Sequence, residues 1–226
     1  MPRRINFAFL LFLAACATSV AIPPNRHGLR VVPDRATYER LARADASKRM
    51  VDLATIPGIR LDIRYATEDN FMKRPLYPAA RAFLRAPAAV ALRRIQEELA
   101  REGLGLKVWD AYRPYGITEA MWEPIRNPDY VADPAKGSRH NRGAAVDVTL
   151  VDRNGYELIM PTAYDDFSPR AAHAFTELAP QMLLNRQKLR DVMTKHGFDP
   201  LPSEWWHYDY REWERFELMN VPLGEL

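Results

Sequence analysis

Two short motifs contain the side chains of this chain best suited to chemistry. The first has the pattern Ser-x-His-x-x-Gly-x-Ala-x-Asp and places His140 seven residues before Asp147. The second is Glu-x-x-His, formed by Glu204 and His207. Two imidazoles and one carboxylate fill three of the four positions around a zinc ion and leave the fourth for water. A glutamate three residues from the last ligand can take a proton from that water. We therefore expect a hydrolytic site with one zinc ion per chain.

The chain has three other histidines, His27, His173 and His196. A lone histidine is usually a surface residue or a satisfied core residue, and we interpret these three in that way. Either motif alone would be weak, since a motif match is only a hypothesis. The two motifs in this order are far less expected by chance, and together they favour a metal site over the alternative.

The spacing within the first motif predicts an irregular backbone. On a regular strand, residues seven apart point to opposite faces. Gly143 lies between the two ligands, where a turn or bulge can reset the register at little steric cost. Asp147 lies in the apolar, β-branched run of residues 146–151, which predicts a buried strand. A carboxylate buried there requires a partner, and a metal ion is one such partner.

The second motif is also oddly spaced for a strand. Glu204 directly follows Pro202 and Ser203, so we expect it in the irregular segment before a strand, with His207 inside that strand.

Arg113 is a further candidate, because it follows an alternating apolar stretch and precedes Pro114. This pattern predicts a strand-to-helix turn. A guanidinium fixed there can hold its donor fork against a carbonyl oxygen. From these residues alone, a surface salt bridge is the favoured alternative.

The elements that position these residues are mixed in type. Leading prolines, terminal glycines and apolar periodicity predict the helices, and apolar alternation predicts the strands. Because helices and strands do not strictly alternate, the sequence predicts an α+β fold with a central, mainly antiparallel sheet and flanking helices. Helices are expected over 36–48, from 87 to 103 and around 189–197, and strands over 59–65, 105–109, 145–151 and 205–210.

From about Leu61 to Tyr210 the sequence resembles the D-alanyl-D-alanine dipeptidases of the VanX type. These belong to the zinc D,D-peptidases, which are related in fold to the hedgehog signalling domain. The resemblance rests on both motifs and on Ile63-Arg64-Tyr65-Ala66-Thr67, Asn70-Phe71, Gly105 to Pro114 and Asn185-Arg186.

The resemblance implies a role for each site residue. It makes His140, Asp147 and His207 the zinc ligands, Glu204 the general base, and Arg113 the cation that stabilises the oxyanion.

It also implies, more loosely, an aspartate that binds the free ammonium group of the substrate. The matching stretch, Met160 to Asp165, has a proline at position 161 where the family has glycine. Asp165 is the expected residue and Asp166 the fallback. Ser138 is expected to contact the substrate carboxylate, with a turn-forming serine as the equal alternative.

The N-terminus predicts export. Arg3 and Arg4 precede a short apolar stretch typical of a signal peptide, too short to span a bilayer. The stretch ends in Leu13-Ala14-Ala15-Cys16, which resembles a bacterial lipobox, and Cys16 is the only cysteine. We expect a signal peptide over 1–15, lipidation of Cys16 and a periplasmic, membrane-anchored lipoprotein. The alternative is cleavage after Ala21, which would release a soluble protein.

Composition fits one enzyme domain. Removing residues 1–15 removes two arginines and no acidic residue, so the net charge falls from +3 to +1 and the high pI gives no reason to invoke nucleic acid. The proline-containing segment 16–34 is expected to be a tether, and 35–226 a single zinc peptidase domain. The sequence does not fix the oligomeric state.

The residues indicate a zinc hydrolase, and the resemblance implies that it hydrolyses the D-alanyl-D-alanine dipeptide in peptidoglycan metabolism. The first alternative is a D,D-carboxypeptidase that trims longer cell-wall stem peptides and would need an open cleft. The second is a non-catalytic, zinc-stabilised lipoprotein that binds the cell wall. The pairing of Glu204 with Arg113 argues against this last reading, because a purely structural zinc site uses neither residue.

Overall fold

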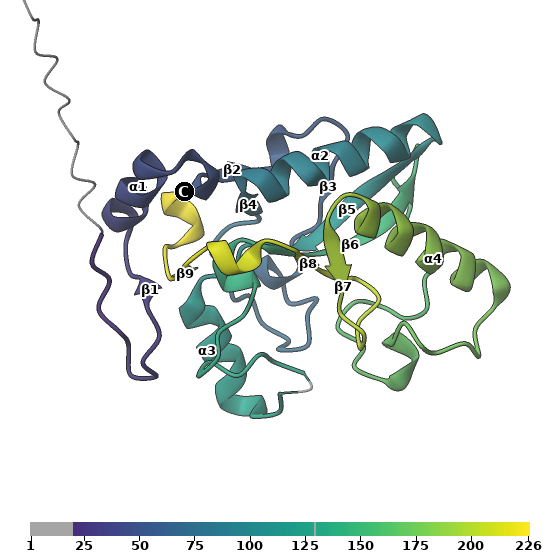
Figure 1. The fold of residues 1–226 in the computed structure, drawn as a ribbon. Coiled ribbons are helices and arrows are strands. Elements are labelled where there is room, and N and C mark those ends of the chain that lie inside the picture. Colours follow the sequence, from purple (N-terminus) through teal and green to yellow (C-terminus); the bar gives the residue numbers. More distant parts are fainter. Residues whose placement is uncertain (1–19, 129) are drawn as a thin grey trace, which may run out of the picture.

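A five-stranded sheet forms the centre of the computed structural model, which describes residues 20–128 and 130–226 (Figure 1). The strand order is β3-β5-β6-β8-β7, and every neighbouring pair is antiparallel except β3 and β5. This confirms the expected α+β fold with a mainly antiparallel sheet. In chain order the strands are β3 (Arg60–Leu61), β5 (Leu104–Asp110), β6 (Ala145–Asp152), β7 (Phe198–Pro200) and β8 (His207–Tyr210).

The strand register places three polar residues at one level of the sheet. Asp110 on β5 pairs with Asp147 on β6, and Asp147 pairs with His207 on β8. The β5–β6 register shifts between Val108 and Asp110, as in a β-bulge. The strands predicted near 105–109, 145–151 and 205–210 are therefore present, and they bring the two motifs side by side.

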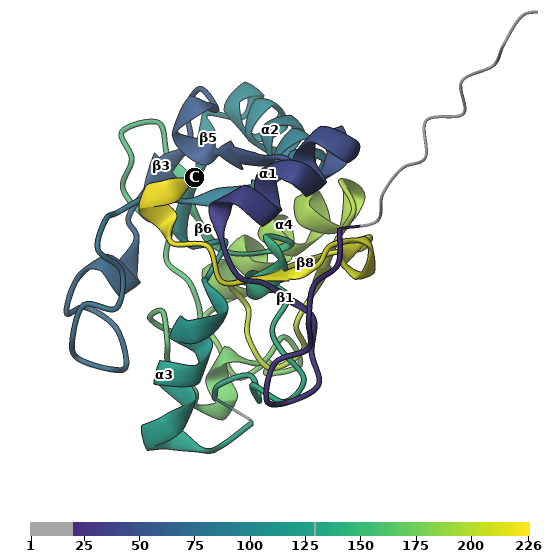
Figure 2. The ribbon, with the colours of Figure 1, turned by 90° about the vertical axis from the view of Figure 1, so that its left-hand side faces the viewer.

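Two long helices cover one side of the sheet. These are α2 (Ala86–Arg101) and α4 (Pro180–Lys195), which contact each other as well as the sheet. Each has proline in its first turn, and each is followed by a glycine with a left-handed backbone, Gly103 and Gly197. The start of α2 and the C-terminal ends of both helices are thus where the sequence predicted them. In Figures 1 and 2, α3 (Tyr115–Ile125) lies on the opposite side of the sheet from α2. The strand-to-helix turn predicted at Arg113 and Pro114 is where α3 begins, but the sequence patterns did not predict the extent of this helix.

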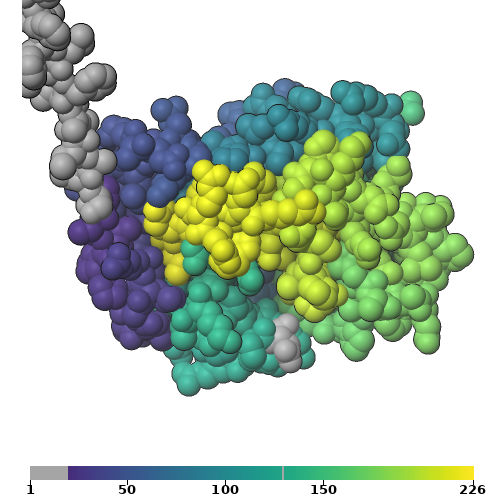
Figure 3. Space-filling model, in the orientation of Figure 1, coloured from purple at the N-terminus to yellow at the C-terminus, as the bar shows by residue number. Residues whose placement is uncertain are grey.

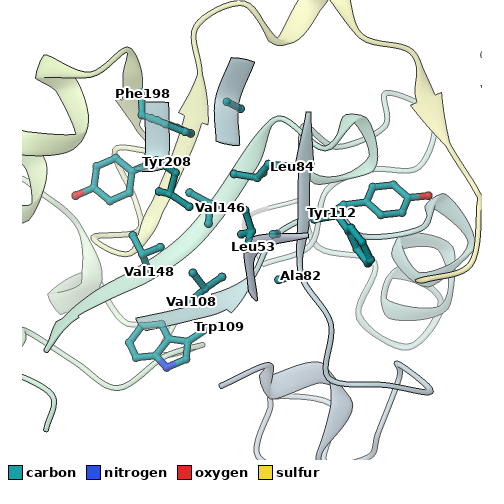
Figure 4. Packing of buried hydrophobic residues seen from close by; sticks show 14 of the residues in the cluster. Leu53, Ala82, Leu84, Val108, Trp109, Tyr112, Val146, Val148, Phe198 and Tyr208 are labelled. Carbon is teal, nitrogen blue, oxygen red and sulfur yellow. The ribbon is translucent and has the colours of Figure 1, made fainter. Parts of the chain in front are cut away.

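The core lies between the sheet and these two helices. Val108, Val146 and Val148 point into it from β5 and β6, and Leu53 and Leu84 reach it from the neighbouring segments (Figure 4). All five side chains are fully buried. The apolar residues on this side of the sheet leave the other side of the same strands free for the polar residues of the site.

The remaining elements pack around one end of the sheet. They are α1 (Arg35–Ala44) and the strand pairs β1 (Val31–Val32) with β9 (Leu218–Met219) and β2 (Met50–Asp52) with β4 (Phe83–Arg85). The parallel pairing of β1 with β9 joins segments from the two ends of the chain. In the space-filling view, the C-terminal residues in yellow cross the face between the N-terminal and the green segments (Figure 3).

Residues 20–34, the described part of the expected tether, pack against the domain. They include β1, and Ile22 is buried in the core cluster. The expected signal peptide over 1–15 and the expected lipidation site, Cys16, lie outside the described residues. No helix within the described part of the chain is long and apolar enough to cross a membrane.

Two expected elements differ in extent from the structure. The strand expected over 59–65 is only β3, because the chain enters a 3₁₀ turn at Arg64–Ala66, where the carbonyl of Tyr65 accepts hydrogen bonds from two later amides. The helix expected over 36–48 ends at Ala44, and a separate 3₁₀ turn, Ala46–Lys48, follows it.

Candidate metal centre and active site

The two motifs converge on one cluster of three buried side chains. Nε2 of His140 lies 3.2 Å from Nδ1 of His207. The Oδ1 atom of Asp147 lies 3.0 Å from this Nδ1 and 3.4 Å from Nε2 of His140. Ligand atoms placed tetrahedrally at zinc bond lengths of about 2.0–2.1 Å are about 3.3 Å apart. The three donor atoms therefore already have the spacing of a zinc site, and they are the one such cluster among the described residues.

Hydrogen bonds on the far side of each imidazole fix its orientation. Nδ1 of His140 donates to the carbonyl oxygen of Ala111 at 2.6 Å, and Nε2 of His207 donates to Oδ1 of Asp209 at 3.0 Å. With Nδ1 of His140 and Nε2 of His207 used in this way, the other nitrogen of each ring faces the cluster. Such outer partners orient metal-binding histidines and raise their basicity.

The local backbone explains how His140 and Asp147 meet. His140 lies in a 3₁₀ turn, His140–Arg142, which ends at Gly143 with φ at +66°. The left-handed φ favours glycine at position 143, and a β-carbon there would also lie 2.6 Å from the end of the Met50 side chain. The chain then enters β6, where Asp147 faces the turn. The prediction that Gly143 resets the direction of the chain is confirmed.

The electrostatics of the cluster favour a charged carboxylate. Burial by itself would raise the pKa of Asp147, but hydrogen bonds and charge attraction from His140 and His207 lower it well below its usual range. Tyr164 donates a further hydrogen bond, 2.8 Å long, to the second oxygen of Asp147. An anionic oxygen and two imidazole nitrogens form a donor set that suits zinc.

Glu204 lies beside this cluster, in the irregular segment before β8, as predicted. It lines the same cavity of about 620 Å³ as the three candidate ligands. Burial raises the pKa of its carboxyl above the usual glutamate value. A carboxylate with a raised pKa is a stronger base, which suits proton transfer near neutral pH.

Arg113 lies in the turn between β5 and α3, as predicted, and also lines the cavity. Its Nε and Nη2 atoms donate to Oδ2 of Asp110, at 3.0 and 2.7 Å. The Asn141 side chain donates to the carbonyl oxygen of Arg113 and ties this turn to the metal motif. Both charges of the pair are buried, so the alternative of a surface salt bridge does not hold.

Asp165 reaches the same cavity from the loop after β6, whereas Asp166 does not line it. Oδ1 of Asp165 accepts a hydrogen bond from the Tyr65 hydroxyl at 3.1 Å, and Oδ2 accepts one from the Phe71 amide at 3.2 Å. Burial raises the pKa of this carboxyl to about 7. The residue has a left-handed backbone, with φ at +59°, which aspartate tolerates better than most residues.

Ser138 also lines the cavity, and its hydroxyl accepts a hydrogen bond from the His140 amide at 3.2 Å. This is a turn contact, so the serine serves the backbone whether or not it touches a substrate. The remaining histidines lie outside the cluster, as expected. His196 pairs with Glu98, and burial lowers the pKa of His173 to about 4.

Three residues of the site were missed by sequence reasoning. Asp110 holds Arg113, Asp209 holds His207, and Tyr164 holds Asp147. A signal existed for the first two, since Asp209 lies two residues after His207 on one strand and Asp110 lies three residues before Arg113. Tyr164 follows a long connection, and no local pattern relates it to Asp147.

Comparisons with known proteins agree with this site. Residues 46–217 match the family model for D-ala-D-ala dipeptidases, Peptidase_M15. The D-alanyl-D-alanine dipeptidase of Escherichia coli is 34% identical over 75% of this chain and 89% of its own length. The D-alanyl-D-alanine dipeptidase of Enterococcus faecium is 32% identical over 70% of this chain and 88% of its own length. Among solved structures, the LD-carboxypeptidase LdcB covers 75% of this chain and 78% of its own, at 21% identity and a TM-score of 0.42, a similarity too distant to carry a functional argument.

Proposed function

The chain belongs to the family of D-alanyl-D-alanine dipeptidases and is a zinc metallopeptidase, and we propose that it hydrolyses the D-alanyl-D-alanine dipeptide in bacterial cell-wall metabolism. The observation that carries this proposal is the convergence of three kinds of group on one cavity. These are a zinc-spaced donor cluster, a partly buried glutamate and a carboxylate suited to an ammonium group.

The residues of the site divide the reaction between them. His140, Asp147 and His207 would hold the zinc ion, which when bound would lower the pKa of a water molecule and polarise the peptide carbonyl. Glu204 takes the proton of the attacking water and then delivers a proton to the leaving amine. The Arg113 guanidinium, held by Asp110, donates to the oxygen on which negative charge develops.

Asp165 supports a dipeptide as the substrate. Its two oxygens use only one hydrogen bond each within the described protein, which leaves them able to accept from a substrate ammonium. A free amino end brings the positive charge that this half-buried carboxylate lacks. An acylated stem peptide would instead place a neutral amide there.

The test compares two substrates with the purified, zinc-loaded protein. D-Ala-D-Ala should be hydrolysed at least about a hundredfold faster, in kcat/KM, than N-acetyl-D-Ala-D-Ala, because acetylation leaves a buried charge unpaired. Equal rates on the two substrates would favour the D,D-carboxypeptidase alternative. Zinc binding without hydrolysis of either substrate would favour the non-catalytic alternative.

We also propose that the protein is an exported lipoprotein, anchored to a membrane of the periplasm through Cys16. The support is the N-terminal sequence alone, in which a short apolar stretch ends in a lipobox-like Leu13-Ala14-Ala15-Cys16. In cells, Cys16→Ser should move the protein from the membrane fraction to the soluble fraction. If unsubstituted protein is already soluble and begins at Ile22, the alternative cleavage after Ala21 is correct instead.

A further inference from the structure

The main cavity has two ends with opposite chemistry. Asp165 is held by Tyr65 and Phe71, which follow β3 at one edge of the sheet. Asp209 lies on β8, two strands beyond β5, and Arg139 lies beside it. The metal cluster is formed by β6, β8 and the 3₁₀ turn His140–Arg142 that precedes β6. The cavity thus runs from Asp165, past the donor cluster, to Arg139.

The Arg139 guanidinium is held in place, but its hydrogen-bond donors are not fully used. It directly precedes His140, so the 3₁₀ turn that places the ligand also places this side chain. The guanidinium lies over the Trp213 ring, 4.7 Å from its centroid, and its Nε is 3.5 Å from Oδ2 of Asp209. Within residues 20–128 and 130–226 its guanidinium makes no hydrogen bond at normal distance, and the side chain is 48% exposed. A stacked arginine with open donors is prepared to bind a planar anion.

The other arginine of the cavity is not available in the same way. Arg113 uses Nε and Nη2 on Asp110, and both partners are buried. Arg142, three residues after Arg139, also lies over the Trp213 ring, but it donates to the Phe216 carbonyl and does not line the cavity. Among the described residues, Arg139 is therefore the arginine of this cavity whose guanidinium is not held by a buried carboxylate at hydrogen-bond distance.

We propose that Arg139 binds the free carboxylate of the substrate, so that the site recognises both charged ends of a small zwitterionic dipeptide. This inference rests on the proposed function, because it takes the ammonium end to lie at Asp165. With that end fixed and the peptide carbonyl at the donor cluster, the carboxylate extends toward β8, where Arg139 lies. The contact of Arg139 with Asp209 is long enough to be exchanged for a bidentate pair with the ligand.

The experiment compares D-Ala-D-Ala with its C-terminal amide, which removes the carboxylate and keeps the ammonium. The unsubstituted enzyme should prefer the free acid by at least about tenfold in kcat/KM. Arg139→Ala should lower kcat/KM for the free acid by about ten- to hundredfold, mainly through KM, and change the value for the amide by less than about threefold. Arg139→Lys should give an intermediate preference, because the charge remains and the fork is lost.

Two controls separate binding from structural damage. Arg153→Ala removes the same charge from an exposed position beyond the end of β6 and should leave the preference unchanged. The zinc content of Arg139→Ala should equal that of the unsubstituted enzyme, which shows that His207 and Asp209 remain in place. An unchanged preference for the free acid in Arg139→Ala, or no preference in the unsubstituted enzyme, would overturn the inference.

Binding measurements keep the inference testable if no dipeptide is hydrolysed, an outcome that would refute the proposed function. Calorimetric titration of D-Ala-D-Ala and its amide into zinc-loaded Glu204→Ala protein should then still show tighter binding of the free acid. The difference in affinity between the free acid and the amide should vanish in the double variant that carries both Glu204→Ala and Arg139→Ala. Equal binding of the two compounds, or no binding of either, would overturn the assignment of Arg139.

Discussion

Replacing Asp165 by asparagine should lower the hydrolytic activity and raise the thermal stability of the folded protein. Asparagine keeps the shape of the side chain and tolerates the left-handed φ of +59°. It can also keep both hydrogen bonds of the carboxylate: its oxygen accepts from the Phe71 amide, and its NH₂ group donates to the Tyr65 hydroxyl, which can accept. The substitution therefore removes the charge and little else.

The magnitude follows from the raised pKa of Asp165. Burial raises this pKa from 3.8 to about 7, so the folded protein holds a proton here that the unfolded chain has lost at intermediate pH. The stability that this proton provides is present below about pH 4 and is lost as pH rises through about 7. A rise of this size corresponds to about 4 kcal/mol at high pH, and partial solvent access to the loop reduces it to about 2 kcal/mol.

The assay is thermal unfolding of zinc-loaded protein at pH 5 and pH 8. At pH 5 the folded carboxyl is protonated but most unfolded chains have already lost this proton, so Asp165→Asn should melt only slightly above the unsubstituted protein. At pH 8 it should melt several degrees higher, since about 1 kcal/mol shifts the Tm of a domain of this size by about 2–4 °C. Hydrolysis of D-Ala-D-Ala should fall at the same time. A variant that is destabilised equally at both pH values would refute the idea that Asp165 is a strained, buried charge.

Three further predictions concern the metal and the catalytic groups. His207→Ala should abolish zinc binding, whereas His196→Ala should leave one zinc per chain by metal analysis; a retained zinc in His207→Ala would show that the ligand is wrong. Glu204→Ala should keep the zinc and lose about two to four orders of magnitude in kcat, so full turnover would assign the base to another group. Arg113→Ala should lower kcat and also destabilise the protein by about 3–5 kcal/mol in denaturant unfolding, because Asp110 is left as an unpaired buried charge; adding Asp110→Asn should recover much of the stability but not the activity.

The metal cluster could be predicted from the sequence because its chemistry constrains residue types and order. His140 and Asp147 belong to one motif, and the glycine between them indicated the turn that joins them. Strands β5 and β6 were also predicted, because β5 has apolar alternation and β6 is an apolar, β-branched run typical of a buried strand.

The rest of the site depends on tertiary contacts that no local sequence pattern predicts. Tyr164 meets Asp147 only because the loop after β6 folds back over the sheet. The extent of α3 was not predicted, because the helix begins without a side-chain cap and contains Pro124 in its last turn. The strand expected over 59–65 is short because tertiary hydrogen bonds to Tyr65 override local alternation.

The alignment of Asp110, Asp147 and His207 across three strands has a consequence for the biosynthesis of the protein. Side chains alternate along a strand, so a slip of β8 by one residue would turn His207 to the opposite face and leave the donor set incomplete. His140 and Asp147 are also synthesised well before His207, which lies near the end of the chain. Tight metal capture must therefore wait until nearly the whole domain is made and β8 has docked in register. Zinc binding late in folding then favours the correct register of β8, because only the correctly paired sheet gains the free energy of metal binding.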